Sequence, residues 1–247
     1  MNRSNVKNIA CISVDNTKTF EEKNLNELYV NEGEKAAQAT KELIEACKYY
    51  GITTINILEE HPLGHISLAA NYKNKNVFDL ITYDEVQAWT EEDNGIGERA
   101  EFTLSELKKF LSEVGSQRLR PDHAIEKTEG VELTQPLEEE DFDLKIIKGT
   151  NPAREAYSGF DETTLDEELK KREKKILLMS GVATDYCLGK TALDAHKKGY
   201  DVYVISETIR GVAKETTDAI LQTMQDEKIQ FITTKDLFAL LSKYPQK

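Results

Sequence analysis

At residues 176–187 the chain reads ILLMSGVATDYC, a short apolar run followed by the start of a helical pattern that continues to Gly199. The run 176–179 has the composition of a buried strand, and a glycine is a common end for a helix. A thiol one turn into such a helix lies near its positive end, which favours the thiolate. Cys187 is therefore a candidate nucleophile, although a cysteine is more often a small core residue.

Similar short apolar runs recur along the chain and alternate with helical patterns. The other predicted strands are residues 6–14, 52–58, 144–147, 201–205 and 231–233, and the predicted helices are 34–50, 167–174, 185–198 and 217–227. Alternating strands and helices are typical of a mostly parallel sheet covered by helices on both faces. We therefore predict a doubly wound, three-layer α/β/α fold.

No linker or internal repeat divides the 247 residues, so we expect a single domain, 1–247. Residues about 70–120 break the alternation of strands and helices. They contain an acidic, turn-rich stretch and a capping-box pattern, Thr103 with Glu106, which predicts the start of a helix. We expect an insertion over one end of the sheet, either a surface excursion or a lid.

Composition limits the classes of partner. A net charge of −13 argues against binding nucleic acid or an anionic membrane, since both need a basic surface. No apolar run approaches the roughly 20 residues that span a bilayer. The three cysteines are scattered, and Met1–Ser4 lacks the apolar core of a signal peptide. We expect a cytoplasmic protein with reduced thiols, and a homo-oligomer is left open.

Groups with catalytic chemistry follow four of the predicted strands. Asp15, a Glu/His cluster beginning at Glu59, Lys148 and Cys187 all come after such a run. In open parallel sheets, ligands bind beyond the carboxyl ends of the strands. We therefore expect an acid, a cation, a thiol and the Glu/His cluster to meet at one edge of the sheet.

The Glu/His cluster indicates a metal. His61 and His65 lie in one loop that begins with a carboxylate, and His123 could supply a third imidazole. Imidazoles combined with carboxylates suit zinc, manganese or iron(II). Spacing alone is a moderate signal, because paired loop histidines also occur without a metal. His196 lies beside two lysines and reads as a surface residue.

Four stretches resemble motifs of the isochorismatase-like cysteine hydrolases, and of the nicotinamidases among them. They are VDNTKTF at 14–20, HPLGHIS at 61–67, KG at 148–149 with AYSGF at 156–160, and GVATDYC at 181–187. The resemblance spans most of the chain, and its last motif is highly specific. It implies hydrolysis of nicotinamide to nicotinate and ammonia through a thioester, as in NAD salvage.

The same resemblance implies a role for individual residues. It implies a catalytic triad of Asp15, Lys148 and Cys187. It implies one divalent metal ion, with zinc expected first, held by Glu59, His61, His65 and His123. It implies a cis peptide at Val182–Ala183, an oxyanion hole from the N–H groups of Ala183 and Cys187, and substrate walls from Phe20 and Tyr157.

Three positions depart from the family pattern. Glu59 stands where aspartate is usual, Thr17 replaces a glutamine, and Arg120 stands where a tryptophan commonly precedes the third histidine. Trp89, in the insertion, is a candidate to fold back and replace that tryptophan. Two alternative functions therefore stay open: a related hydrolase of another small amide, carbamoyl compound or vinyl ether, and a catalytically silent binding protein. Cys11 and Cys47 read as core residues.

Overall fold

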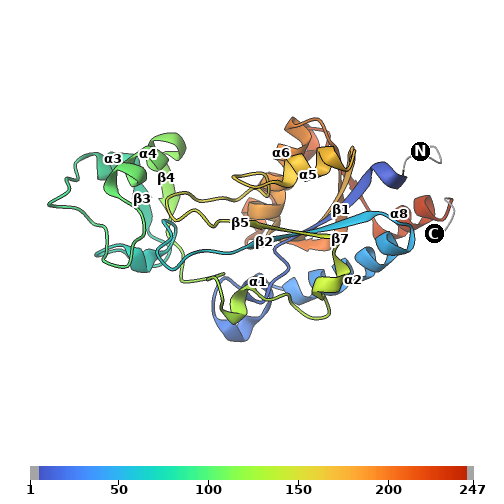
Figure 1. Cartoon of the computed structure of the whole chain (residues 1–247), viewed down its shortest axis with the longest axis horizontal. Helices are drawn as coiled ribbons and strands as arrows, with labels where there is room; N and C mark the ends of the chain where they lie inside the picture. Colours follow the sequence, from blue (N-terminus) through green and yellow to red (C-terminus); the bar gives the residue numbers. More distant parts are fainter. Residues whose placement is uncertain (1–5, 244–247) are drawn as a thin grey trace.

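Six parallel strands form the central sheet of the computed structural model, which describes residues 6–243 (Figure 1). In spatial order they are β5 (Leu144–Lys148), β2 (Thr53–Glu59), β1 (Ile9–Val14), β6 (Ile176–Val182), β7 (Asp201–Arg210) and β8 (Gln230–Ile232). Every residue of β1 and β6 is buried, which is expected for strands covered on both faces. Met1–Ser4, where the sequence shows no signal-peptide core, lie outside the described residues.

Helices cover both faces of this sheet. On one face lie α2 (Gly33–Tyr49) and α8 (Thr234–Leu241), and on the other lie α5 (Leu165–Lys171), α6 (Gly189–Lys197) and α7 (Lys214–Asp226). Cys11 and Cys47 are fully buried in the core beneath α2, as the sequence predicts. The doubly wound, mostly parallel fold is therefore confirmed.

Two strands are longer than the sequence pattern predicts. β6 continues to Val182 because Gly181 and Val182 still pair with residues 209–210 of β7 after a shift in register. β7 continues to Arg210 through the polar segment 206–208, which carries no strand signal. These extensions bring the end of β6 to the segment that contains Cys187.

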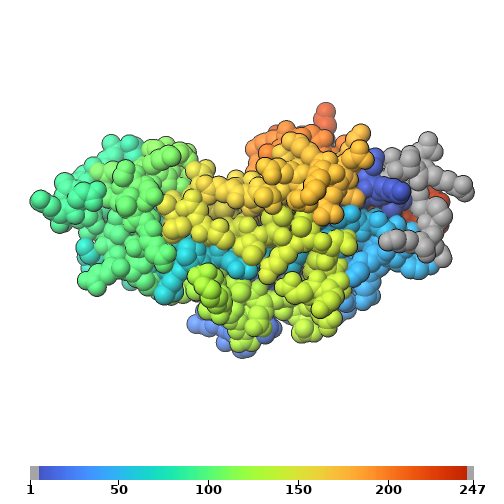
Figure 2. Space-filling view, in the orientation of Figure 1, coloured from blue at the N-terminus to red at the C-terminus, as the bar shows by residue number. Residues whose placement is uncertain are grey.

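The insertion forms a small lobe, residues 66–120, at one end of the molecule (Figure 2). It contains an antiparallel pair, β3 (Leu80–Thr82) and β4 (Ser116–Arg118), and the helices α3 (Tyr83–Gln87) and α4 (Leu104–Val114). The predicted capping box opens α4, with Thr103 and Glu106 bonding each other's backbone N–H. The lobe has its own apolar cluster, including Ile81, Leu107 and Phe110, so it is more than a surface excursion.

Short helical segments fill the loops: α1 (Lys18–Glu21) and the single turns at Val6–Asn8, Lys23–Leu25, Ala69–Asn71, Glu129–Val131 and Glu139–Asp141. Within residues 6–243, none of the helices combines the length and the apolar character that crossing a membrane requires.

Candidate active site

Four polar residues lie at the carboxyl ends of four adjacent strands. Asp15 follows β1, Glu59 ends β2, Lys148 ends β5, and Cys187 comes shortly after β6. The sheet order β5-β2-β1-β6 makes these ends neighbours, and Glu59 pairs directly with Lys148 in the ladder. The sheet therefore brings together the four groups that the sequence places after strands.

The Lys148 ammonium lies at the centre of this group and is buried. Its Nζ is 3.1 Å from Asp15 Oδ2, 2.6 Å from Glu59 Oε1 and 3.4 Å from Cys187 Sγ. Burial alone would lower the pKa of Lys148, but the acidic groups around it, Asp15 first, raise that pKa well above its usual value. The side chain therefore stays an ammonium, and one cation holds two carboxylates and a thiol together.

The protonation states of Asp15 and Cys187 differ from the simple expectation of a resting thiolate. Burial raises the pKa of Asp15 to about 6, and the attraction of Lys148 offsets this only in part. Burial also raises the pKa of Cys187 well above its usual value, although Lys148 again opposes the shift. At neutral pH the site thus presents a protonated thiol beside a mostly ionised carboxylate, which is the arrangement of a nucleophile and its general base.

The backbone that leads to Cys187 is irregular. Gly181 has a φ of +115°, and a Cβ atom there would lie 2.0 Å from the carbonyl oxygen of Val14, so only glycine fits. The Val182–Ala183 peptide is cis, as the family resemblance implies. Residues Thr184–Leu188 form a π-helical turn before α6, where the pattern predicts a continuous α-helix. Such turns are frequent at functional sites.

Two side chains that the sequence analysis did not single out as site residues brace this turn. The Asp185 carboxylate accepts hydrogen bonds from the backbone N–H groups of residues 212 and 213, at 2.9 and 3.2 Å. The Thr191 hydroxyl donates to the carbonyl of Cys187 at 2.6 Å and accepts from the N–H of Gly159 at 2.9 Å. Asp185 and Thr191 both belong to the nucleophile motif or its continuation, which was the available signal.

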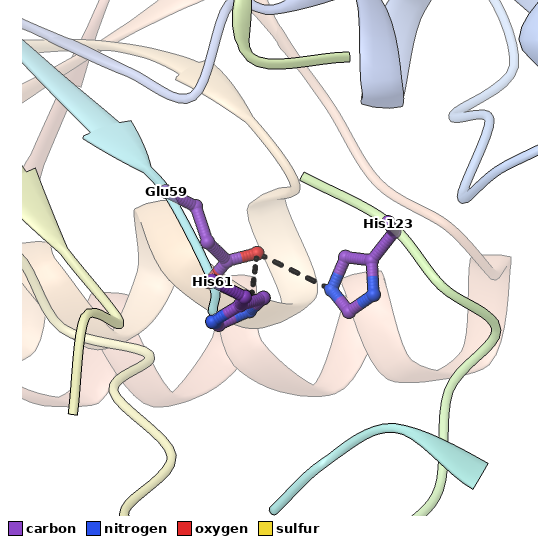
Figure 3. Close-up of side chains that lie close together, drawn as sticks. All are labelled: Glu59, His61 and His123. Carbon is purple, nitrogen blue, oxygen red and sulfur yellow. Dashed lines mark ion pairs between the residues drawn. The ribbon is translucent and has the colours of Figure 1, made fainter. Parts of the chain in front are cut away.

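One carboxylate oxygen and two imidazoles meet beside this group. Glu59 Oε2 is 3.6 Å from His61 Nε2 and 3.5 Å from His123 Nε2 (Figure 3). The Nδ1 atom of His61 lies 2.8 Å from the carbonyl oxygen of Gly149, and that of His123 lies 2.9 Å from the carbonyl oxygen of Pro121. Such contacts fix the tautomer, with Nδ1 protonated and Nε2 carrying a lone pair.

These donors fit a divalent metal ion. Ligand atoms of Glu59, His61 and His123 lie within 4.8 Å of one another, and all three residues are buried. His61 Nε2 is buried and, among the described residues, has no hydrogen-bond partner. A buried lone pair without a donor is costly, and a cation would satisfy it. Two imidazoles and a carboxylate suit zinc, manganese or iron(II).

His65 lies outside this three-residue cluster, although the sequence analysis expects it as a fourth ligand. Its ring stacks on His61, but Nδ1 lies 2.8 Å from the Ser67 hydroxyl and Nε2 lies 3.0 Å from the carbonyl oxygen of Arg154. Both nitrogens are thus bonded to protein. Burial lowers the pKa of His65 well below its usual value, and the neighbouring His61 adds to this. A neutral imidazole with both nitrogens engaged supports the His61 ring and has no free lone pair for a metal.

A cavity of about 190 Å³ lies against Cys187, Glu59 and His123. Its lining includes the two predicted substrate walls, Phe20 and Tyr157, as well as Ala183 and Arg120. Trp89 does not line the cavity; it packs in the apolar cluster of the lobe, so the expected replacement of the family tryptophan does not occur. A lining of aromatic side chains with a few polar groups is typical of sites that bind small organic ligands.

Comparison with known proteins agrees with this geometry. The family model of the isochorismatase domain matches residues 10–236. A nicotinamidase of Escherichia coli is 29% identical over 198 residues, which are 78% of this chain and 79% of that protein. The solved nicotinamidase/pyrazinamidase of Acinetobacter baumanii superposes with a TM-score of 0.74 at 26% identity and covers 94% of this chain and 98% of its own.

The solved pyrazinamidase of Pyrococcus horikoshii in complex with zinc superposes with a TM-score of 0.68 at 27% identity, over 92% of this chain and 99% of its own. Because the family match extends over nearly the whole sequence and the fold agrees with it, the chain belongs to the isochorismatase family of hydrolases.

Proposed function

We propose that this protein is a nicotinamidase that hydrolyses nicotinamide to nicotinate and ammonia through a thioester on Cys187. The observation that carries the proposal is the contact of Lys148 with Asp15, Glu59 and Cys187 at the base of the cavity. It joins the groups needed for amide hydrolysis to the two-histidine, one-carboxylate cluster. Similarity to proteins described as nicotinamidases supports the choice of substrate.

In the acylation step, Asp15 takes the proton of the Cys187 thiol, and the sulfur attacks the carboxamide carbon. Lys148 stabilises the thiolate as it forms, because its ammonium already lies 3.4 Å from Sγ. The N–H groups of Ala183 and Cys187 bind the oxyanion, a contribution of typically about 3 kcal/mol for each donor. Asp15 then returns its proton to the leaving amine, the C–N bond breaks, and ammonia departs.

In the deacylation step, Asp15 acts again as the base and takes a proton from water, which attacks the thioester carbon. The C–S bond breaks, nicotinate leaves, and the proton returns to Sγ. Phe20 and Tyr157, which line the cavity, hold the pyridine ring. Both half-reactions use the same base, and Asp15 lies within 4.8 Å of the Cys187 thiol.

Glu59, His61 and His123 are the proposed ligands of one divalent ion, for which we expect zinc. Bound there, the ion would supply a Lewis acid that anchors the pyridine nitrogen of the substrate. Glu59 has a second task, because its other oxygen holds Lys148. The longer side chain at this position, where the family usually has aspartate, reaches both groups at once.

The experiment is ammonia release from nicotinamide by the purified protein, with and without a metal chelator. Cys187→Ala should abolish release while leaving folding and metal content unchanged. Cys47→Ala is the matched control, because it removes a buried thiol from the core beneath α2 and should keep activity. Full activity of Cys187→Ala would contradict the mechanism, and activity that resists chelation would contradict the metal-anchored substrate.

A further inference from the structure

Arg120 places a positive charge in the wall of the active-site cavity. Its backbone is held against the loop at residues 67–69. The Arg120 N–H donates to the carbonyl of Ser67 at 2.8 Å, and the Arg120 carbonyl accepts from the N–H of Ala69 at 2.9 Å. The side chain is half-buried and lines the cavity. Among residues 6–243, no carboxylate oxygen comes within 4.0 Å of its guanidinium nitrogens.

The carboxylates that line the same cavity already have partners. Glu27 accepts from the N–H of Ala124 at 3.1 Å, and Glu155 accepts from its neighbour Ala156 at 3.0 Å and from the Gln117 amide at 3.4 Å. Glu59, the third lining carboxylate, holds Lys148. In the described part of the chain, none of these three carboxylates forms an ion pair with Arg120.

Two tyrosines hold the guanidinium instead of an acid. Its central carbon lies 4.8 Å from the centre of the Tyr186 ring, a cation–π contact, and Tyr186 directly precedes Cys187. Burial alone would lower the pKa of Arg120, but Tyr157 and Tyr186 raise it. The group is therefore charged and positioned close to the nucleophile. A guanidinium has five N–H donors in a planar fork that matches a carboxylate.

We propose that Arg120 is a specificity residue that extends the substrate range beyond nicotinamide to aromatic carboxamides with an anionic substituent on the ring, and that its guanidinium binds that anion. The inference rests on the proposed amide hydrolysis at Cys187 and names the substrate class more closely. Arg120 lines the same cavity as Cys187, so one ligand can reach both groups. An anionic substituent would give this half-buried cation a partner that nicotinamide does not supply.

The test compares ammonia release from nicotinamide with release from 5-carbamoylpyridine-3-carboxylate, which keeps the ring nitrogen and carboxamide and adds one carboxylate. The readout is the ratio of kcat/KM for the anionic substrate to kcat/KM for nicotinamide. Arg120→Trp, flat but neutral, should lower this ratio roughly 10- to 100-fold, the value of a hydrogen bond to a charged group. Arg120→Lys, charged but not planar, should lower it less than tenfold.

Arg172→Gln is the matched control, because it removes one positive charge from the exposed end of α5, outside the cavity. It should leave the ratio unchanged. If Arg120 only stacks on the substrate ring, Arg120→Trp will preserve the ratio, and the inference is overturned.

A second readout separates this inference from the proposed function. If the wild-type protein releases ammonia from neither compound, nicotinamide hydrolysis is refuted, and calorimetry with pyridine-3,5-dicarboxylate and nicotinate then tests Arg120 alone. Arg120→Trp should weaken binding of the dicarboxylate at least tenfold more than binding of nicotinate. An equal effect on the two ligands would overturn the anion site.

Discussion

Replacing Asp15 with asparagine tests the central claim about the site, that this buried carboxyl titrates near pH 6. The group has an ordinary pKa of 3.8 and a folded-state pKa of about 6. At about 1.36 kcal/mol for each pKa unit, ionising it in the folded protein costs about 3 kcal/mol more than in the unfolded chain. Because the folded pKa lies above the unfolded one, this cost is absent below pH 4 and complete above pH 6.

Asparagine removes the titration and keeps the shape. Whatever contacts the amide gains or loses shift stability by an amount that does not change with pH. The unfolding free energy of Asp15→Asn should therefore rise relative to wild type as the pH increases, by about 3 kcal/mol in full and about half of that between pH 5 and pH 8. The measurement is urea unfolding of the chelator-treated proteins at these two pH values.

The pH dependence of activity reports the same pKa of Asp15 in the folded protein. Because Asp15 must be ionised to accept the thiol proton, kcat/KM of wild type should fall about tenfold for each pH unit below about 6. Asp15→Asn should be inactive throughout. A stability difference between the two proteins that stays constant from pH 5 to pH 8 would refute the raised pKa, and with it the assignment of a general base poised near neutrality.

Three further changes have clear expectations. Gly181→Ala should lower the unfolding free energy by about 4 kcal/mol or more, because its Cβ would meet a carbonyl oxygen at 2.0 Å. Gly115→Ala, also at positive φ but with nothing within 4 Å of its Cβ, should lower it by about 1 kcal/mol. Equal losses for the two variants in urea unfolding would contradict the contact at Gly181. His123→Ala should weaken metal binding by at least about 100-fold, whereas His65→Gln should bind as much metal as wild type. If elemental analysis showed that His65→Gln had lost the metal, His65 would belong to the ligand set. Lys148→Met should lower the unfolding free energy by about 3–5 kcal/mol at pH 8, since it leaves two buried carboxylates without their cation. If calorimetry showed the variant to be as stable as wild type, Lys148 would not stabilise the fold through these ion pairs.

The sheet could be predicted from the sequence because its strands are short, apolar and bounded by turns. Every predicted strand is present, and the strand ends gave the positions of Asp15, Lys148 and Cys187. The extension of β7 through residues 206–208 was missed, because polar residues in a strand give no periodic signal. The lobe was expected only as an insertion, since its apolar cluster draws on residues far apart in the sequence.

The electrostatics of the site were less accessible to sequence reasoning. Placement at a helix start predicts a thiolate at Cys187, yet burial outweighs the nearby charge of Lys148, and burial is a property of the whole fold. Similarly, the spacing of His61 and His65 makes both of them candidate ligands. Only the contacts with Ser67 and with the carbonyl of Arg154 show that His65 has no free nitrogen.

The lobe at residues 66–120 supplies part of the cavity wall from outside the sheet. The acid, the lysine and the thiol are carried by the sheet, whereas Phe78 and Arg120 reach the same cavity from the lobe, which has a core of its own. Substitutions in the lobe can change which ligand is admitted without disturbing the packing that holds the reacting groups. Exchanging this segment between relatives therefore tests how far the lobe sets the selectivity while the sheet keeps the reacting groups in place.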